Sequence, residues 1–320
     1  MTYSSGGLIQ ATDYNGFAST TANANVNDLW ATGATDKGWG ETALSTVSAA
    51  GVVTATNWAS LVNTISSMGS QTGTSITARS APVTGNLIQI LAALNTDLTN
   101  ITTNRANAVA VGTQFTAYTG TNSKPAATSG ATWSITFVNT VTFASANAAR
   151  FFFNGGGLIK IDVSKTATGA LGDPEWNDLA NTLCGDIFIS GIAAAHTIAG
   201  VSRTGVTKTG GTGTPTTLAT TLGFYNLTTS DQVIYKQFAD TAPYTSNFIQ
   251  HSAKTAGSGT QVVITTLWSA SDGDPISGGT ASSGATPGTA PTTICTYFPP
   301  SSTYLTTASW GTPTVAATTT

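Results

Sequence analysis

Within the stretch Trp133-Ser-Ile-Thr-Phe-Val-Asn-Thr-Val-Thr-Phe143, apolar side chains alternate with hydroxyl-bearing ones at 133–137 and again at 141–143. A period of two is typical of a β-strand with one face buried and the other solvated. Further apolar runs of strand length lie at 187–189, 233–238 and 262–268. No regular crossover helices separate these runs, so we expect the strands to pair antiparallel. The sequence therefore predicts a mainly antiparallel, sandwich-like β domain over residues 106–320.

The segment Arg150-Phe-Phe-Phe-Asn-Gly-Gly-Gly-Leu-Ile-Lys-Ile-Asp-Val163 carries the sharpest local signature. Two apolar runs flank Asn154, Gly155, Gly156 and Gly157, and glycine supplies the positive φ that hairpin turns require. The unbroken apolar run 151–153 is typical of a strand covered on both faces. We therefore predict a central β-hairpin that turns at residues 154–157.

Helical spacing dominates the first third of the chain. Thr56 is a candidate N-cap for a helix that ends near Gly69 and has an apolar face around Trp58. A second helix is predicted from spacings of four and three among Leu87, Leu91, Leu94, Leu98 and Ile101. We favour docking of this seam on the Trp58 helix over a trimeric coiled coil, because two-heptad coils are marginal. The fold class is thus α+β, with residues 1–105 a helical attachment or oligomerisation region.

Charge is scarce throughout the chain. Only 8% of the 320 residues are charged and about a fifth are threonine, whereas ordinary globular domains carry about a quarter charged residues. The eleven basic residues do not cluster, so nucleic-acid binding is not expected. The first residues lack the pattern of a signal peptide, and no apolar run is long enough to span a membrane. Residues from Thr314 onward are expected to fray.

Candidates for catalysis are few. Catalysis by carboxylate pairs needs two acids that face one another, but the chain has only two glutamates, Glu41 and Glu175. Glu175 fits the first turn of a helix, which leaves Glu41 as the candidate acid of a polysaccharide depolymerase. His196 and His251 are the only histidines and lie in no metal-binding pattern. We therefore expect no enzyme activity, metal or cofactor.

The two cysteines, Cys184 and Cys295, are far apart in the sequence and form no Cys-x-x-Cys motif. We favour two buried free thiols over a disulfide.

Some aromatic residues lie in loop-like sequence. Trp39, Tyr118, Trp268 and Trp310 have polar neighbours, and exposed rings of this kind stack on sugar rings. They are candidate contacts to a host-surface glycan, although core packing is the commoner fate of such residues. A carbohydrate-binding adhesin module is therefore an alternative function.

Five segments resemble a known family. They are Tyr3-Ser-Ser-Gly-Gly-Leu-Ile-Gln-Ala-Thr-Asp-Tyr-Asn15, Thr54-Ala-Thr-Asn-Trp-Ala-Ser-Leu61, Ala149-Arg-Phe-Phe-Phe-Asn-Gly-Gly-Gly157, Gly223-Phe-Tyr-Asn-Leu-Thr-Thr229, and Pro300-Ser-Ser-Thr-Tyr-Leu305 with Trp310-Gly-Thr-Pro313. In this order they look like poorly characterised virion structural proteins of tailed bacteriophages, especially marine and cyanobacterial phages. The resemblance implies a virion component without a known enzymatic site.

Composition and resemblance agree on one class of function. We expect a non-enzymatic structural protein of the tail, baseplate or fibre apparatus, with a head-surface decoration or fibre protein as the alternative. A surface poor in charge allows close packing of identical copies. The expected partners are further copies of the chain, with a trimer as the first guess, and other virion proteins.

Overall fold

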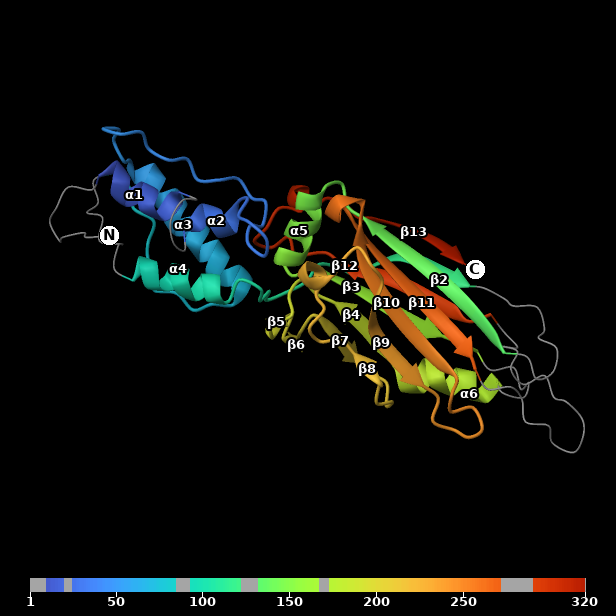
Figure 1. The fold of residues 1–320 in the computed structure, drawn as a ribbon. Coiled ribbons are helices and arrows are strands. Elements are labelled where there is room, and N and C mark those ends of the chain that lie inside the picture. The colour runs from blue at the N-terminus through green and yellow to red at the C-terminus, as the bar shows by residue number, and fades with distance from the viewer. Residues whose placement is uncertain are drawn as a thin grey trace, which may run out of the picture.

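The computed structural model describes residues 10–19, 25–84, 93–121, 132–166, 173–271 and 290–319. Figure 1 shows a cluster of helices at one end of the molecule and a β-sandwich at the other. The chain passes from the helices to the strands between residues 103 and 115. We call residues 10–103 the helical head and the two larger sheets with their connections the sandwich. None of the described helices combines the length and the apolar character needed to cross a membrane.

The helical head contains α1 (Ala11–Ala18), α2 (Val26–Trp30), α3 (Ala55–Thr72) and α4 (Leu94–Thr103). The cap of α3 is Thr54, two residues before the predicted Thr56, because the Thr54 hydroxyl accepts a hydrogen bond from the Asn57 N–H at 3.2 Å. The helix also runs past Gly69 and ends at Gly73, whose φ is +66°. Leu94, Leu98 and Ile101 are buried in the same core cluster as Trp58. The described part of the seam therefore docks within the chain, while Leu87 and Leu91 lie outside the described residues.

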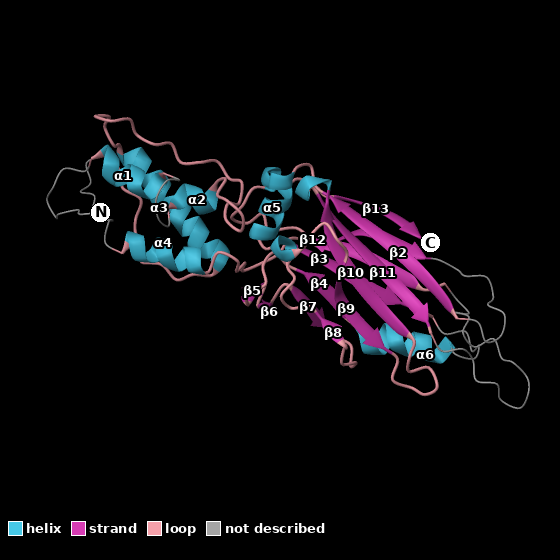
Figure 2. Cartoon of the chain, in the orientation of Figure 1, coloured by secondary structure: helices cyan, strands magenta, loops and turns pink. Residues whose placement is uncertain are grey.

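Two antiparallel sheets form the sandwich, as predicted (Figure 2). One sheet has the order β1 (Phe115–Thr121), β12 (Thr292–Phe298), β3 (Leu158–Ser164), β4 (Asp186–Ile189), β7 (Val206–Thr209). The other has the order β13 (Thr314–Thr319), β2 (Trp133–Thr142), β11 (Gln261–Ala270), β10 (Phe248–Ala256), β9 (Gln232–Phe238), β8 (Thr217–Leu218). Alternate residues of both sheets face one shared apolar core, represented by Phe137, Ile161, Ile264 and Trp268.

The predicted hairpin at residues 150–163 is wrong in its first half. Residues Ala146–Asn154 form helix α5, and only Leu158 onward is a strand, β3. The Ser145 hydroxyl accepts a hydrogen bond from the Ala148 N–H at 3.0 Å and so caps the helix. The run 151–153 is buried all round because α5 lies where the head meets the sandwich. Gly155–Gly157 therefore connect a helix to a strand, and Gly156 has the expected positive φ, +95°.

Shorter elements complete the fold. Helix α6 (Asp173–Asp178) continues into the π-helix η1 (Leu179–Cys184), which ends at Gly185 with φ +73°. A small hairpin of β5 (His196–Ile198) and β6 (Val201–Arg203) leaves the first sheet, and three single turns are η2 (Phe224–Asn226), η3 (Gly257–Gly259) and η4 (Thr307–Ser309). The expectation that the tail from Thr314 frays is wrong, because β13 pairs with β2 along its whole length.

Candidate functional site: the joint between the helical head and the sandwich

A glycine-rich loop carries the head into contact with the sandwich. We call residues 31–41 the junction loop. It folds back on α2 through backbone hydrogen bonds from Trp39 N–H to the Leu29 carbonyl at 3.0 Å and from Gly40 N–H to the Ala31 carbonyl at 2.7 Å. Gly40 has φ +79°, and a Cβ there would lie 2.4 Å from the Phe151 ring of α5. Only glycine fits both that backbone conformation and that close approach.

The last residue of α5 receives this loop. Asn154 is 6% exposed, and its Nδ2 donates to the carbonyls of Gly38 at 2.9 Å, Lys37 at 3.0 Å and Thr35 at 3.2 Å. In the opposite direction, the Trp39 Nε1 donates to the Asn154 carbonyl at 3.0 Å. One amide side chain thus shares its two protons among three loop carbonyls, of which the Gly38 carbonyl is in a buried contact and the other two are in partly buried ones.

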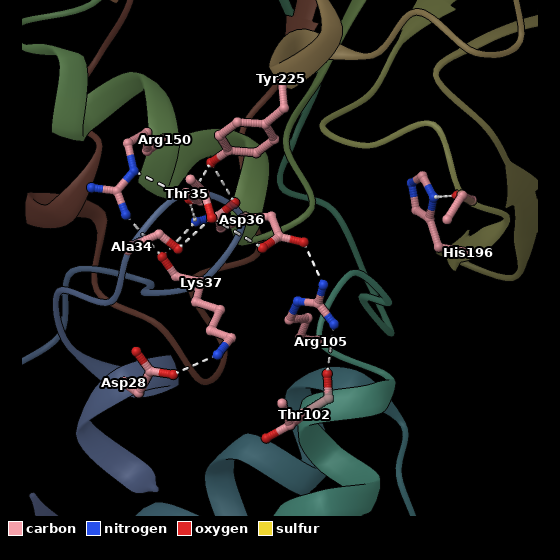
Figure 3. A network of polar contacts seen from close by, with 12 residues as sticks. Asp28, Ala34, Thr35, Asp36, Lys37, Thr102, Arg105, Arg150, His196 and Tyr225 are labelled. Atoms are coloured by element: carbon pink, nitrogen blue, oxygen red, sulfur yellow. Dashed lines mark hydrogen bonds and ion pairs between the residues drawn. The ribbon is translucent and has the colours of Figure 1, made fainter. Parts of the chain in front are cut away.

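A guanidinium group on the same helix holds the rest of the loop (Figure 3). Arg150 donates from Nε to the Thr35 carbonyl at 3.1 Å, and from Nη2 to the carbonyls of Lys37, at 3.1 Å, and of Gly33. Its Nη1 donates to the Asn147 Oδ1 at 2.8 Å, which orients the group. Hydrogen bonds from a charged donor are stronger than neutral ones, so Arg150 fixes the loop conformation.

Tyr225 closes the site from a third part of the chain. Its hydroxyl lies 2.7 Å from the Asn154 Oδ1 and 2.8 Å from the Thr35 carbonyl (Figure 3). Burial raises the pKa of this phenol well above its usual range, so the group keeps its proton and remains a donor at neutral pH. The neighbouring Phe224 stacks on Phe153 of α5, with ring centroids 4.5 Å apart. Turn η2 and helix α5 are therefore held together by both polar and apolar contacts.

Ion pairs border the loop on its outer side. Lys37 Nζ lies 2.8 Å from Asp28 Oδ2, and Arg105 contacts Asp36 (Figure 3). All four side chains are about a fifth to a third exposed, so solvent weakens each pair to at most about 1 kcal/mol. The Asp36–Arg105 pair still links the junction loop to the segment that leaves α4.

A second set of contacts lies beside the first. Gln71 of α3 donates from Nε2 to the Gly155 carbonyl at 3.0 Å. At Gly156 a Cβ would lie 2.5 Å from the Ala108 Cβ, so the segment after the head passes directly over the turn after α5. Ala108 also exchanges backbone hydrogen bonds with β5 and its turn, from its N–H to the Thr197 carbonyl and from the Ala199 N–H to its carbonyl. The predicted turn residues thus lie at the joint.

Glu41, the candidate catalytic acid, ties the junction loop to the C-terminal segment. It is 8% exposed and accepts hydrogen bonds from the Thr306 N–H at 2.5 Å and from the Thr306 hydroxyl at 3.1 Å. Burial raises the pKa of this carboxyl, and the threonine hydrogen bonds oppose that rise. These hydrogen bonds hold together two segments that are 265 residues apart in the chain.

The aromatic residues proposed for glycan contact are mostly in the core, which corrects that expectation. Trp39 and Trp268 are fully buried and Trp310 is 1% exposed. Tyr118 is half-buried and packs against the core. A buried ring offers no face to a sugar, so three of the four residues contribute apolar area to the interior instead.

The histidines and cysteines are also interior residues. His196 is buried with its Nδ1 2.8 Å from the Ala194 carbonyl, and His251 lies in the sandwich core with its Nδ1 2.9 Å from the Thr266 hydroxyl. Cys184 and Cys295 are free and buried, as expected, and burial raises the pKa of each thiol to about 12. Among the described residues, no three His, Cys, Asp or Glu side chains converge to hold a metal ion.

The joint can therefore do one thing that the geometry specifies: it fixes the helical head on the sandwich through directional polar contacts around the buried Asn154. Sequence reasoning missed Arg150, Tyr225 and the Asn154 amide, because their partners in the junction loop lie 113 to 190 residues away. The available signal was an arginine within the segment 146–154 of a chain with only eleven basic residues. Comparison with family models, with curated proteins and with solved structures gave no match.

Proposed function

We propose that this chain is a non-enzymatic structural protein of a tailed-bacteriophage virion, located in the tail, baseplate or fibre apparatus. The observation that carries the proposal is the joint, in which Asn154, Arg150 and Tyr225 together hold the junction loop. A flexible linker would let the two parts reorient freely. A buried polar joint instead transmits orientation from one part to the other, which a particle component needs.

The two parts have different roles in this proposal. The helical head attaches the chain to the particle or to other copies, and the sandwich forms the body. The resemblance of five segments to phage virion proteins supports this assignment, as does the low charge of the chain, which lets neutral surfaces pack closely. We do not propose glycan binding through the four aromatic residues, since three of them lie in the core.

The role that we assign to Glu41 is structural. Its carboxylate accepts hydrogen bonds from the backbone and the hydroxyl of Thr306, an arrangement that holds the C-terminal segment against the junction loop. Glutamine keeps an acceptor oxygen in the same place, so the Glu41→Gln chain should be incorporated into particles at the normal level.

The direct test is the location of the protein on purified particles. Peptide mass spectrometry of gradient-purified virions establishes whether the chain is present, and gold-labelled antibody on intact particles shows where. We expect the peptides at a fixed ratio to the major capsid protein, and label at the tail end or baseplate. Label over the head would replace this location with head decoration. Absence of the peptides from purified particles would overturn the proposal.

A further inference from the structure

Each sheet of the sandwich has two edge strands, and exposed edges are sites where another chain pairs. In the described structure these edges are β1 and β7 in one sheet and β13 and β8 in the other. Natural proteins protect edges with short strands, charged side chains, prolines or bulges. The four edges differ in whether they carry such a device.

Three of the edges are protected. Strand β8 is only two residues long. Strand β7 carries Lys208, whose Nζ crosses to the carbonyls of Gly213 at 2.6 Å and Gly211 at 3.1 Å. Strand β1 contains an irregularity in register between Thr116 and Tyr118, and a bulge of this kind twists an edge away from further pairing.

Strand β13 has none of these devices. Its sequence, Thr314-Val-Ala-Ala-Thr-Thr319, contains no charge, proline or glycine. It pairs with β2 in unbroken register from Thr314 opposite Thr142 to Thr319 opposite Phe137. Four of its six residues are exposed, and among the described residues no strand pairs with its other edge. Figure 1 shows β13 along the outer margin of the sandwich.

An exposed aromatic ring lies beside this edge. Phe115 of β1 is 49% exposed and stacks on Tyr297, with ring centroids 5.0 Å apart. The Tyr297 hydroxyl donates to the carbonyl of Pro313 at 3.1 Å, the residue directly before β13. The exposed ring of Phe115 therefore lies close to the start of β13, on the neighbouring strand of the other sheet.

We propose that β13 pairs antiparallel with β13 of a second copy of this chain, so that one sheet runs continuously through a two-fold dimer. A second copy is the occupant that the edge favours, because an uncharged strand can meet its own copy without like-charge repulsion. An isologous contact of this type also closes and leaves no open edge for further growth.

The side-chain pattern of β13 selects the register. Val315 and Ala317 are half-buried, whereas Thr314, Ala316 and Thr318 are exposed. In an antiparallel pair, opposite residues lie on the same face. A two-fold axis at Ala316 places Val315 opposite the Ala317 of the second copy and Thr314 opposite its Thr318. This register pairs apolar with apolar and hydroxyl with hydroxyl. It predicts a dimer, whereas the first guess from the sequence was a trimer.

The first test uses opposite charges at the axis. Light scattering on the full chain should give twice the 32.3 kDa chain mass. Ala316→Lys and Ala316→Glu should each raise the Kd of the dimer roughly tenfold or more, so that each variant is a monomer at concentrations where the wild type is a dimer. A mixture of the two variants should restore the dimer, because the opposite charges then face each other. Val233→Lys is the matched control, at an exposed side chain of β9, and it should leave the dimer intact.

The second test reports the register directly. Ala316→Cys should form a cross-copy disulfide under mild oxidation, because opposite residues of an antiparallel pair lie within disulfide range. Ala317→Cys should not, and the native cysteines are buried. A monomer at all concentrations, a trimer, or a dimer that Ala316→Lys leaves unchanged would overturn the proposal. These outcomes do not depend on whether the chain is found on virions.

Discussion

Replacement of Asn154 by aspartate changes one group of the joint with almost no change in shape. The wild-type Nδ2 shares its two protons among three carbonyl oxygens at 2.9 to 3.2 Å. In Asn154→Asp, a carboxylate oxygen faces those oxygens with no proton to give. Arg150 and Tyr225 still donate to the carbonyls of Lys37 and Thr35. Loss of two hydrogen bonds costs about 2 kcal/mol, and the buried Gly38 carbonyl, which then faces a carboxylate, brings the total to roughly 2 to 4 kcal/mol.

Urea unfolding followed by tryptophan fluorescence measures this loss as a change in midpoint. The matched control is Asn147→Asp on the same helix, where the side chain is exposed and accepts from Arg150. A carboxylate there keeps its partner, so that variant should be as stable as the wild type or slightly more stable.

The pH dependence of the Asn154→Asp variant provides an internal check. Burial among carbonyls raises the pKa of the new carboxyl in the folded state. The folded variant therefore takes up a proton before the unfolded chain does, and its stability recovers toward the wild-type value as the pH falls. A loss below about 1 kcal/mol at pH 7, or a loss equal to that of Asn147→Asp, would refute the argument that Asn154 holds the junction loop.

Three other predictions test separate features. Glu41→Gln keeps an acceptor for the C-terminal segment and should leave the melting temperature unchanged or higher at pH 7, whereas Glu41→Ala should lower the free energy of unfolding by about 1 to 3 kcal/mol. If calorimetry shows equal effects for the two variants, Glu41 does not hold the C-terminal segment through these hydrogen bonds. His251 has its pKa lowered to about 3 by burial, so between its ordinary value of 6.5 and that value only the unfolded chain binds the proton. Unfolding free energy should fall by roughly 3 kcal/mol from pH 7 to pH 4, and a His251→Gln variant with the same fall would contradict this. Gly156→Ala should destabilise more than Gly200→Ala in thermal melts, because both have positive φ but only Gly156 has a neighbour within 3 Å of the added Cβ; similar losses would mean that the close approach is unimportant.

Local pattern was enough for much of the fold. The alternation in β2 and the apolar run in β11 indicated strands, and the Trp58 helix followed from its spacing. The run 151–153 was ambiguous, since a short apolar run fits a buried helix as well as a buried strand. The preceding Ser145 cap and the alanines at 146, 148 and 149 favour helix, and they decide the outcome.

The joint and strand β13 could not be predicted from local sequence patterns, because both depend on partners that are distant in the sequence. Thr35 and Tyr225 are 190 residues apart, and no periodicity relates them. The threonine- and alanine-rich tail has little apolar content, so its strand depends on the ladder that β2 offers. In both cases tertiary contacts, and not the segment itself, determine the structure.

The joint also sets an order of events during synthesis. A ribosome adds about 5 to 20 residues each second, so roughly 10 to 40 s separate the emergence of Thr35 from that of its hydrogen-bond partner Tyr225, 190 residues later. The interval is longer for Glu41, because its partner Thr306 is synthesised 265 residues later. The first helices of the chain are thus made early but are locked in place last. A truncated chain would present a head without its fixed orientation, so the correct orientation of the head marks a completed sandwich.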